Sequence, residues 1–488
     1  MTGPGSSPTP VTDTALPPLR WRAVLGTIAA AAVTVLDLAL TSTALGSIQE
    51  GVGASLDKGA LVISASATAE LVTLALSAYL TRVFRPRTYL ILLVSLFAAG
   101  SLLTANAWSL ESLLVARVIQ GAASGAIMPF AYYAIVVMLP RREHPKAISV
   151  FSLTVTAAYV LGPILSITLA GWLTWRALYY VAVPAGLIAL AIALPGLRQM
   201  PKADATLGRR VSLISIAAAV VGLFFTQYTL DTGGERGWFG SPLVWLTAAV
   251  AVGMLSLFVV NELRTRQPLV DLRLLAQSPF LLSCLFNVVA GAAVYSSYFL
   301  IPYALTTLGY SVGEIGTVSL YGALVQLVIA LFLPVVLRSI DVYLVSLVGA
   351  GVFAVSALVP LLAGPAPGQV EVVGSLMARS VGAGLLLASL GLMVTRTLSS
   401  EQAPSGSLLF NMSRSLGGSL GTAACAAFLV LRETHHDVAS GAALGDRTGR
   451  TSALHDMFAV ALVILVLLAV AFLVGYGVRR LGVGSRVR

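Results

Sequence analysis

The sequence has few charged residues and almost no cysteine. Only 10% of its 488 residues are Asp, Glu, Lys or Arg, whereas 57% are hydrophobic. Soluble domains carry about 25% charged residues, so this composition excludes a water-soluble globular protein. It also excludes a disordered chain, because disorder needs low hydrophobicity and high net charge. The two cysteines, Cys284 and Cys425, lie inside apolar segments and cannot form a disulfide framework.

The sequence also lacks the residue groupings of an enzyme or a metal site. Its four histidines lie in connections or at the edge of an apolar segment, and no His or Cys pair has ligand spacing. Glycine-rich stretches at 382–384 and 417–421 lack the lysine of a phosphate-binding loop, so they predict helix packing instead. We therefore expect no catalytic residue, no metal and no cofactor.

Long apolar segments are abundant. Each is long enough to cross about 30 Å of hydrocarbon as a helix, and the short alternating segments of a membrane β-barrel are absent. The sequence predicts an all-α polytopic membrane protein without a sizeable soluble domain. Fourteen spans are predicted at 23–46, 60–80, 88–107, 112–138, 147–170, 177–196, 211–230, 242–261, 280–303, 314–336, 343–363, 372–394, 406–430 and 454–477.

The basic residues predict the orientation. An even number of spans puts both termini on one side, and the connections on that side carry 21 Lys and Arg residues against 6 on the other. The positive-inside rule then places both termini in the cytoplasm. The net charge of +10 follows from this topology, so no nucleic-acid partner is expected. The basic connections are expected to meet anionic lipid headgroups.

Two carboxylates lie in the middle of apolar segments, Asp37 in the first and Glu70 in the second. A charged carboxylate at the centre of a bilayer costs at least about 2.5 kcal/mol, so it normally faces a cavity or a partner. Each lies on a polar stripe of hydroxyl residues at helical spacing. One interpretation is a hydrogen bond that only holds helices together. The other is proton binding, because desolvation favours the protonated form of a carboxylate.

Arg117 and Gly162-Pro163 are further unusual features of the spans. Arg117 lies near the outer end of the fourth span, where its side chain either extends to the membrane surface or reaches a carboxylate of the first two spans. Gly162-Pro163 interrupts the fifth span, and proline removes a backbone hydrogen bond. Such a break is either a passive kink or a functional one.

Several of these residues fall in motifs that resemble the major facilitator superfamily. Arg117, Gln120, Gly121 and Gly125 fit its fourth-span pattern R-x-x-Q-G-x-x-x-G. Leu36-Asp37 with Thr43-Ala44-Leu45 is similar to the first-span pattern of the 14-span drug:proton antiporter family. Gly162-Pro163 matches the start of its fifth-span antiporter motif, and 411–421 resembles its thirteenth-span motif. The chain therefore resembles a divergent member of that family.

The sequence departs from the family pattern at several positions. Ser166-Ile167 replaces the glycine pair of the antiporter motif, and Arg82 stands where the loop after the second span has Asp. The close packing ascribed to the first motif and the gating contacts ascribed to that Asp therefore cannot be carried over to this chain.

The resemblance implies two six-helix bundles with two inserted helices between them, which rock about a site at the membrane midplane. We expect a cytoplasmic tail at 1–20, the N-terminal bundle at 21–200, the inserted helices at 201–275, the C-terminal bundle at 276–478 and a basic tail at 479–488. Asp37 is predicted to couple protons, and Glu70 to favour cationic substrates. The residues predicted to line the substrate cavity are Thr41, Tyr132, Tyr133, Tyr159, Asn287, Tyr295, Tyr298, Gln326, Asn411 and Arg414.

The favoured function is a proton-coupled antiporter that exports amphipathic or cationic small molecules across the inner membrane. A periplasmic adaptor protein is a further candidate partner. One alternative is a dedicated exporter or importer of a single metabolite, such as a siderophore or an antibiotic. Another is a membrane scaffold or sensor that has lost transport.

Overall fold

The computed structural model describes residues 17–54, 58–170, 173–200, 212–233, 240–265, 268, 270–363, 369–397, 403–440 and 447–484. Residues 1–16 of the expected cytoplasmic tail and residues 485–488 of the expected basic tail lie outside this set. The described chain is helical and contains no strand. Residues 17–20 already belong to the first helix, and residues 479–484 to the last one.

Fourteen of the described helices have 20 residues or more, one for each expected span. They are α1 (Pro17–Thr43), α3 (Gly59–Val83), α4 (Pro86–Ala105), α5 (Leu110–Met138), α6 (His144–Leu165), α7 (Trp175–Leu197), α9 (Leu213–Gly233), α10 (Pro242–Arg264), α11 (Ser278–Thr307), α12 (Val312–Ser339), α13 (Val342–Ala363), α14 (Gln369–Thr397), α15 (Ala403–Ser440) and α16 (Arg447–Gly484). A short helix, α2 (Leu45–Gly51), follows α1.

Local sequence signals set several helix starts. Proline occupies the first turn of α4, α10 and α11, where its missing N–H has no helical partner to lose. Ser109 caps α5 by accepting from the backbone N–H of Ser112, and Ser311 caps α12 reciprocally with Glu314. These capped starts follow tight connections between antiparallel neighbours.

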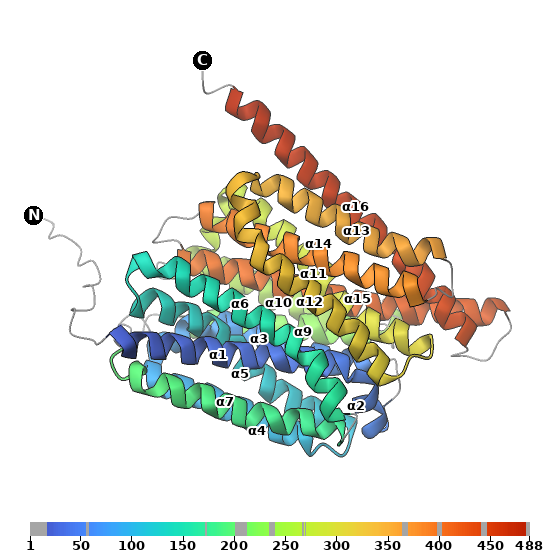
Figure 1. The fold of residues 1–488 in the computed structure, drawn as a ribbon, viewed down its shortest axis with the longest axis horizontal. Coiled ribbons are helices and arrows are strands. Elements are labelled where there is room, and N and C mark those ends of the chain that lie inside the picture. Colours follow the sequence, from blue (N-terminus) through green and yellow to red (C-terminus); the bar gives the residue numbers. More distant parts are fainter. Residues whose placement is uncertain are drawn as a thin grey trace, which may run out of the picture.

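Twelve of the long helices meet the length and hydropathy expected of a membrane span. In α3 and α6 the uninterrupted apolar stretches are shorter, Leu61–Ser77 and Leu153–Leu165. The polytopic all-α class is confirmed, and the count of fourteen spans stays a prediction. Figure 1 shows most of the long helices running roughly parallel, whereas α16 is inclined to them and its C-terminal part projects beyond the other helices.

Two bundles of the same plan make up the body. In the N-terminal bundle, α5 packs against α1, α3 and α4, and α7 packs against α1 and α4. In the C-terminal bundle, α14 packs against α11, α12 and α13, and α16 packs against α11 and α13. Replacing α1, α3, α4, α5 and α7 by α11, α12, α13, α14 and α16 therefore reproduces the same contacts. This is the arrangement of repeats in a major-facilitator-type fold.

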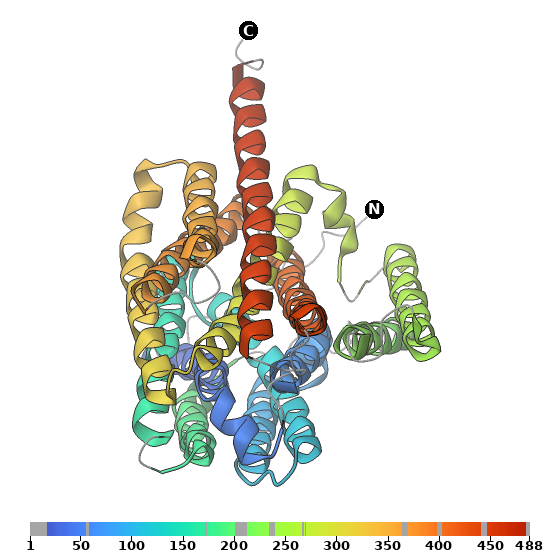
Figure 2. The ribbon, with the colours of Figure 1, turned by 90° about the vertical axis from the view of Figure 1, so that its right-hand side faces the viewer.

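The inserted helices lie outside this body, at one side of Figure 2. Helix α9 packs against α3 of one bundle and α15 of the other, where Ser419 contacts Gln227. Helix α10 packs on α9, and Asn261 donates hydrogen bonds to Ser212 and Ser215. The pair thus covers the seam between the bundles on this side.

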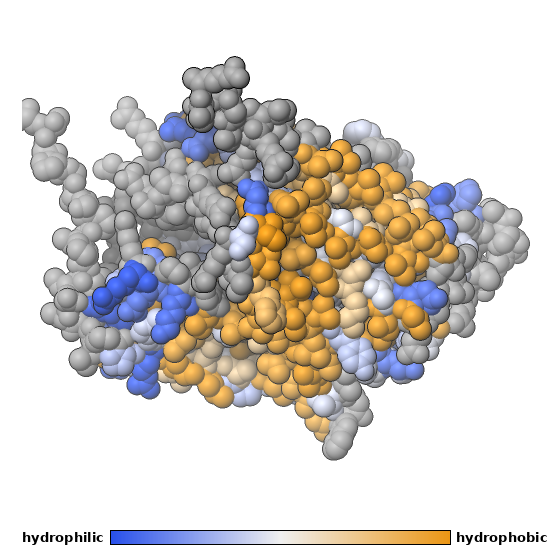
Figure 3. Space-filling view, turned by 45° about the horizontal axis from the view of Figure 1, so that its top comes forward, coloured by the Kyte–Doolittle hydropathy of each residue, from blue (hydrophilic) through white to orange (hydrophobic). Residues whose placement is uncertain are grey.

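Exposed apolar side chains form the outer surface of the helices. Figure 3 shows a broad hydrophobic band across the visible face, with hydrophilic residues at both ends. Members of this exposed set include Val115, Leu246, Val252 and Phe332, each more than half exposed. Because soluble proteins rarely expose contiguous apolar surfaces of this extent, the band marks the part of the molecule that lipid covers.

The bundles meet where α6 packs against α12 and α3 against α15, and also at the ends of α1 and α11. Leu45 and Ile48 next to α1 pack in one apolar cluster with Phe299 and Leu300 of α11. Ser42 donates a hydrogen bond of 2.8 Å to the backbone oxygen of Tyr298, across the two bundles. A cavity of about 420 Å³ lies beside this contact, between α2 and the start of α12.

The predicted orientation can be tested by cysteine labelling. Asn106 lies in the exposed connection between α4 and α5, and Gln277 precedes α11. We expect Asn106→Cys in a cysteine-free background to react with a membrane-impermeant maleimide in intact cells, and Gln277→Cys to react only after permeabilisation. Labelling of Gln277→Cys in intact cells would contradict cytoplasmic termini.

Candidate functional site

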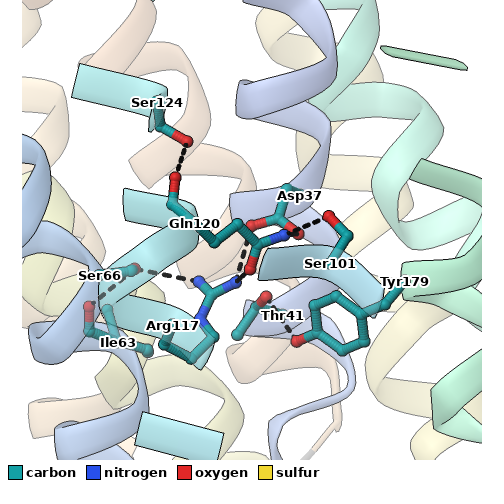
Figure 4. Close-up of polar contacts among 9 residues, drawn as sticks. All are labelled: Asp37, Thr41, Ile63, Ser66, Ser101, Arg117, Gln120, Ser124 and Tyr179. Carbon is teal, nitrogen blue, oxygen red and sulfur yellow. Dashed lines mark hydrogen bonds and ion pairs between the residues drawn. The ribbon is translucent and has the colours of Figure 1, made fainter. Parts of the chain in front are cut away.

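A buried ion pair joins α1 to α5 inside the N-terminal bundle (Figure 4). The Arg117 Nη1 lies 2.8 Å from Asp37 Oδ2, and the two residues are 1% and 4% exposed. Of the two predicted positions for Arg117, the structure therefore shows the one that reaches a carboxylate. A charge this deep in a membrane protein needs such a partner, because an unpaired one is costly to desolvate.

Polar side chains from two further helices complete the pair. Gln120 accepts from Arg117 Nη1 at 2.6 Å and donates its Nε2 to Asp37 Oδ1 at 2.7 Å. The same Nε2 lies 2.8 Å from Ser101 Oγ of α4, and Arg117 Nη2 donates to Ser66 Oγ of α3 at 3.0 Å. Both carboxylate oxygens of Asp37 are thus bound, so its charge is balanced by the surrounding donors. We call these five residues the Arg117 network.

An aromatic residue of α7 closes one side of the network. The Tyr179 hydroxyl and Thr41 Oγ1 are hydrogen-bonded at 2.9 Å, and both residues are fully buried. The Arg117 Cζ lies 6.0 Å from the centre of the Tyr179 ring, within the range of a cation–π contact. Thr41 was predicted to line the substrate cavity, but here its side chain is directed into the bundle.

The motif glycines let α3 and α5 approach closely. A Cβ atom at Gly121 would overlap the backbone of Ser66, and one at Gly125 would overlap the backbone of Glu70. Small residues at such a spacing allow the close helix contact that is typical of membrane interfaces. The glycines therefore bring Ser66 within reach of the Arg117 side chain.

The structure corrects the predicted interruption at Gly162-Pro163, because α6 continues through both residues to Leu165 and packs against α1. A Cβ at Gly162 would collide with Ala39, two residues after Asp37. A π-helical turn, Ser166–Ala170, follows α6 directly. Gly162 therefore allows α6 to lie close to the helix that carries Asp37.

A second polar group lies between the bundles. Glu70 of α3 is partly exposed and interacts electrostatically with Arg414 of α15 and with Arg117. Tyr159 of α6 stacks on Tyr298 of α11 with ring centres 5.9 Å apart, and Tyr295 meets Tyr298 edge-on at 6.0 Å. Each of these three tyrosines is partly exposed. We call Glu70, Arg414 and the three tyrosines the inter-bundle group.

Other predicted cavity residues have different surroundings. Asn287 is 1% exposed and donates to the Phe410 backbone oxygen at 2.6 Å, so it holds α11 to α15 instead of facing a substrate. Tyr132 packs on Phe151 with ring centres 4.5 Å apart, and Tyr133 packs near Phe130. Asn411 accepts from Arg414 at 2.9 Å, and Gln326 lies beside Gly384 of α14.

Sequence reasoning did not assign roles to Ser101, Tyr179, Ser297 or Arg379. The structure places Ser101 in the Arg117 network, Tyr179 against it, and Ser297 and Arg379 next to the inter-bundle group. The sequence could have pointed to Arg379, since it is one of three arginines within or at the ends of the predicted spans and a charge in a span is costly. Within the described part of the chain, no group of three or more His, Cys, Asp or Glu side chains could hold a metal ion.

Comparison with known proteins shows the family of this chain. The family model of the Major Facilitator Superfamily matches residues 27–422. The chain belongs to this superfamily. The match confirms the resemblance that the sequence motifs indicate. The superfamily is one of transporters.

The relatives include multidrug export proteins. The multidrug export protein EmrB of Haemophilus influenzae is 27% identical over 439 residues, which cover 86% of this chain and 83% of that protein. EmrB of Escherichia coli K12 is 29% identical over 301 residues, with 61% of this chain and 58% of that protein covered. The fatty acid resistance protein FarB of Neisseria gonorrhoeae is 28% identical over 278 residues, with 57% and 54% covered.

Solved structures with the same fold include a peptide transporter POT and a nucleoside transporter NupG. The match to the peptide transporter has a TM-score of 0.63 at 14% identity and covers 92% of this chain and 93% of that chain. The match to the nucleoside transporter has a TM-score of 0.60 at 12% identity and covers 93% of this chain and 99% of that chain. At these identities the likeness shows the transporter fold and nothing about substrate.

Proposed function

We propose that this superfamily member exports amphipathic small molecules across the inner membrane in exchange for protons. The buried Asp37–Arg117 pair carries the proposal. It places a carboxylate inside the membrane, and its hydrogen bonds and those of Gln120 link four helices. The multidrug export relatives support the substrate class. Cytoplasmic termini follow from the positive-inside count.

The network suggests how a proton acts on the fold. A proton on Asp37 removes the charge that balances Arg117 and one acceptor of the network. Arg117 is then left buried and poorly paired, which is costly in a low dielectric. The N-terminal bundle can relieve that cost by changing the packing of α1 against α3, α4 and α5. Such a change at the helix that also contacts α11 supports alternating access.

The inter-bundle group is the proposed place of substrate contact. Tyr159 and Tyr298 come from different bundles and stack on each other, so a molecule bound against this pair contacts both bundles. Aromatic faces suit an apolar or amphipathic substrate, and the nearby charges orient it. Arg414 and Arg117 both place positive charge in the electrostatic surroundings of Glu70, which disfavours a further cation there. The preference for cations expected from Glu70 is therefore not assigned to this site.

Two alternatives predict different behaviour. A dedicated exporter or importer would respond to one metabolite alone, whereas a scaffold or sensor would move no protons with any compound. The intact Arg117 network disfavours the scaffold, since a buried ion pair is a costly feature to keep without use. An adaptor protein in the periplasm remains a candidate partner of the exporter.

Everted membrane vesicles distinguish these possibilities. With the lumen acidified relative to the outside, we expect a panel of amphipathic compounds to release protons from the vesicle lumen, as reported by a pH-sensitive dye. Vesicles without the protein are the control for passive leakage. Proton release with a single compound of a broad panel would favour the dedicated transporter. No release with any compound, at confirmed expression, would contradict antiport.

A further inference from the structure

Arg379 of α14 occupies the position in the C-terminal bundle that Arg117 of α5 occupies in the N-terminal one. Helix α14 packs against α11, α12 and α13 as α5 packs against α1, α3 and α4. Each arginine follows a Leu-x-Ala sequence, 114–116 in one case and 376–378 in the other. Ser297 of α11 corresponds to Asp37 of α1, since each lies seven residues before an Ala-Leu pair.

The contacts repeat as well. Arg117 Nη1 binds Asp37 Oδ2 at 2.8 Å, and Arg379 Nη1 donates to Ser297 Oγ at 3.0 Å. Arg117 lies over the Tyr179 ring, and Arg379 Cζ lies 5.7 Å from the centre of the Tyr298 ring. Each guanidinium is thus bound by the corresponding residue of α1 or α11 and lies near a tyrosine ring, although that tyrosine belongs to α7 in the N-terminal bundle and to α11 in the C-terminal one.

The acceptors that neutralise the guanidinium differ between the bundles. Asp37 is replaced by the neutral Ser297, and Gln120, three residues after Arg117, is replaced by Gly382, three residues after Arg379. Within the described ranges no carboxylate lies at ion-pair distance from Arg379, whereas Arg117 has Asp37 at 2.8 Å; the Nε of both arginines has no hydrogen-bond partner. An arginine offers five N–H donors and remains charged, so an acceptor is missing here.

Arg379 consequently adds an uncompensated positive charge next to the inter-bundle group. Glu70 and Arg414 are of opposite sign, and Asp37 and Arg117 neutralise each other inside the N-terminal bundle. Arg379 adds one positive charge beside Tyr298, on which Tyr159 stacks, and its side chain is partly exposed. A guanidinium next to two aromatic faces fits a molecule with an apolar body and one anionic head.

We propose that Arg379, positioned by Ser297 and Tyr298, binds the carboxylate of an amphipathic organic anion. Resting on the proposed function, this assigns the exporter a preference for substrates that carry a negative charge. The carboxylate of the substrate then takes the place at Arg379 that Asp37 takes at Arg117. A bound anion also supplies the compensating charge that a desolvated arginine requires when the bundles close.

Binding of three eight-carbon probes tests the proposal. Octanoate, octanol and octylammonium share one chain and differ only in head-group charge. With purified protein in nanodiscs and empty nanodiscs subtracted, we expect octanoate to bind at least about tenfold more tightly than octanol, as one charge-assisted pair supports. Octylammonium should bind more weakly than octanol, because the site already carries positive charge.

Two substitutions should remove that preference by different routes. Arg379→Gln removes the charge, and octanoate should then bind no better than octanol. Ser297→Asp keeps the arginine but supplies the carboxylate that the N-terminal bundle has at Asp37, and the preference should again disappear. Arg273→Gln, which removes an exposed arginine outside the bundle interface, is the matched control and should keep it. Unchanged octanol binding shows that each variant is folded.

Two outcomes distinguish failure of the anion site from failure of the proposed function. An unchanged octanoate preference in both Arg379→Gln and Ser297→Asp would overturn the anion site, as would equal binding of the three probes by the unmodified protein. Proton release in everted vesicles is measured on the same variants. If release is absent with every compound while the octanoate preference follows Arg379, antiport fails and the binding site stands.

Discussion

Replacement of Asp37 by asparagine should abolish proton-coupled transport. The amide keeps the size of the carboxylate and can still accept a hydrogen bond from Arg117, but it neither takes up nor releases a proton. Substrate-induced proton release in everted vesicles is therefore expected to fall to the level of vesicles without protein. Exchange of labelled for unlabelled substrate at equal pH on both sides needs no proton and should persist.

This substitution also unbalances Arg117, so its stability must be measured. Removal of one partner of a buried pair costs about 3–5 kcal/mol, and the retained amide acceptor should keep the loss of unfolding free energy toward the lower value. Thr34→Val is the matched control on α1, because the Thr34 hydroxyl donates to the Ala31 backbone oxygen of its own helix. Coupled transport by a folded Asp37→Asn variant would contradict the assignment of Asp37.

Replacement of Arg117 by lysine should reduce coupled transport at least about tenfold. Lysine keeps the positive charge but lacks the planar fork, whereas Arg117 bonds Asp37, Gln120 and Ser66 with two separate nitrogens. Loss of hydrogen bonds to charged groups costs about 1.5–3 kcal/mol each, enough for a tenfold effect. The initial rate of proton release in everted vesicles is the measurement.

Arg22→Lys provides the comparison, since Arg22 is exposed near the start of α1 and needs no fixed geometry. It should leave the rate unchanged. A normal rate in Arg117→Lys, at equal expression, would show that charge alone is enough and that the geometry of the network has no part in coupling.

Much of the fold follows from the sequence because lipid imposes simple conditions on a chain. An apolar segment of about 20 residues must become a helix, since its backbone groups find no partner in hydrocarbon. The predicted spans accordingly correspond one to one to the fourteen long helices. The motifs around Arg117 and Gly162-Pro163 indicate the superfamily by themselves, because they are local patterns within single helices.

The sequence did not decide which side of each helix faces which neighbour. Lipid tails are as apolar as the helix surfaces, so no hydrophobic pattern specifies rotation within a membrane bundle. Thr41 and Asn287 were therefore predicted to face a substrate, although both are buried in helix contacts. For the same reason the sequence could not identify the partner of the Arg117 side chain. The packing of α1 on α5 places Asp37 at ion-pair distance from it.

Composition and motif thus determined that this chain crosses the membrane many times, that its basic side is predicted to be cytoplasmic, and that two carboxylates needed explanation. Tertiary structure decided how the charges are paired, because Asp37 and Arg117 are 80 positions apart in the chain and meet at 2.8 Å. It alone shows that arginines at corresponding positions of the two bundles have different partners, a carboxylate at Arg117 and a hydroxyl at Arg379. Charge balance in a low dielectric is a property of neighbours in space, which sequence spacing does not contain.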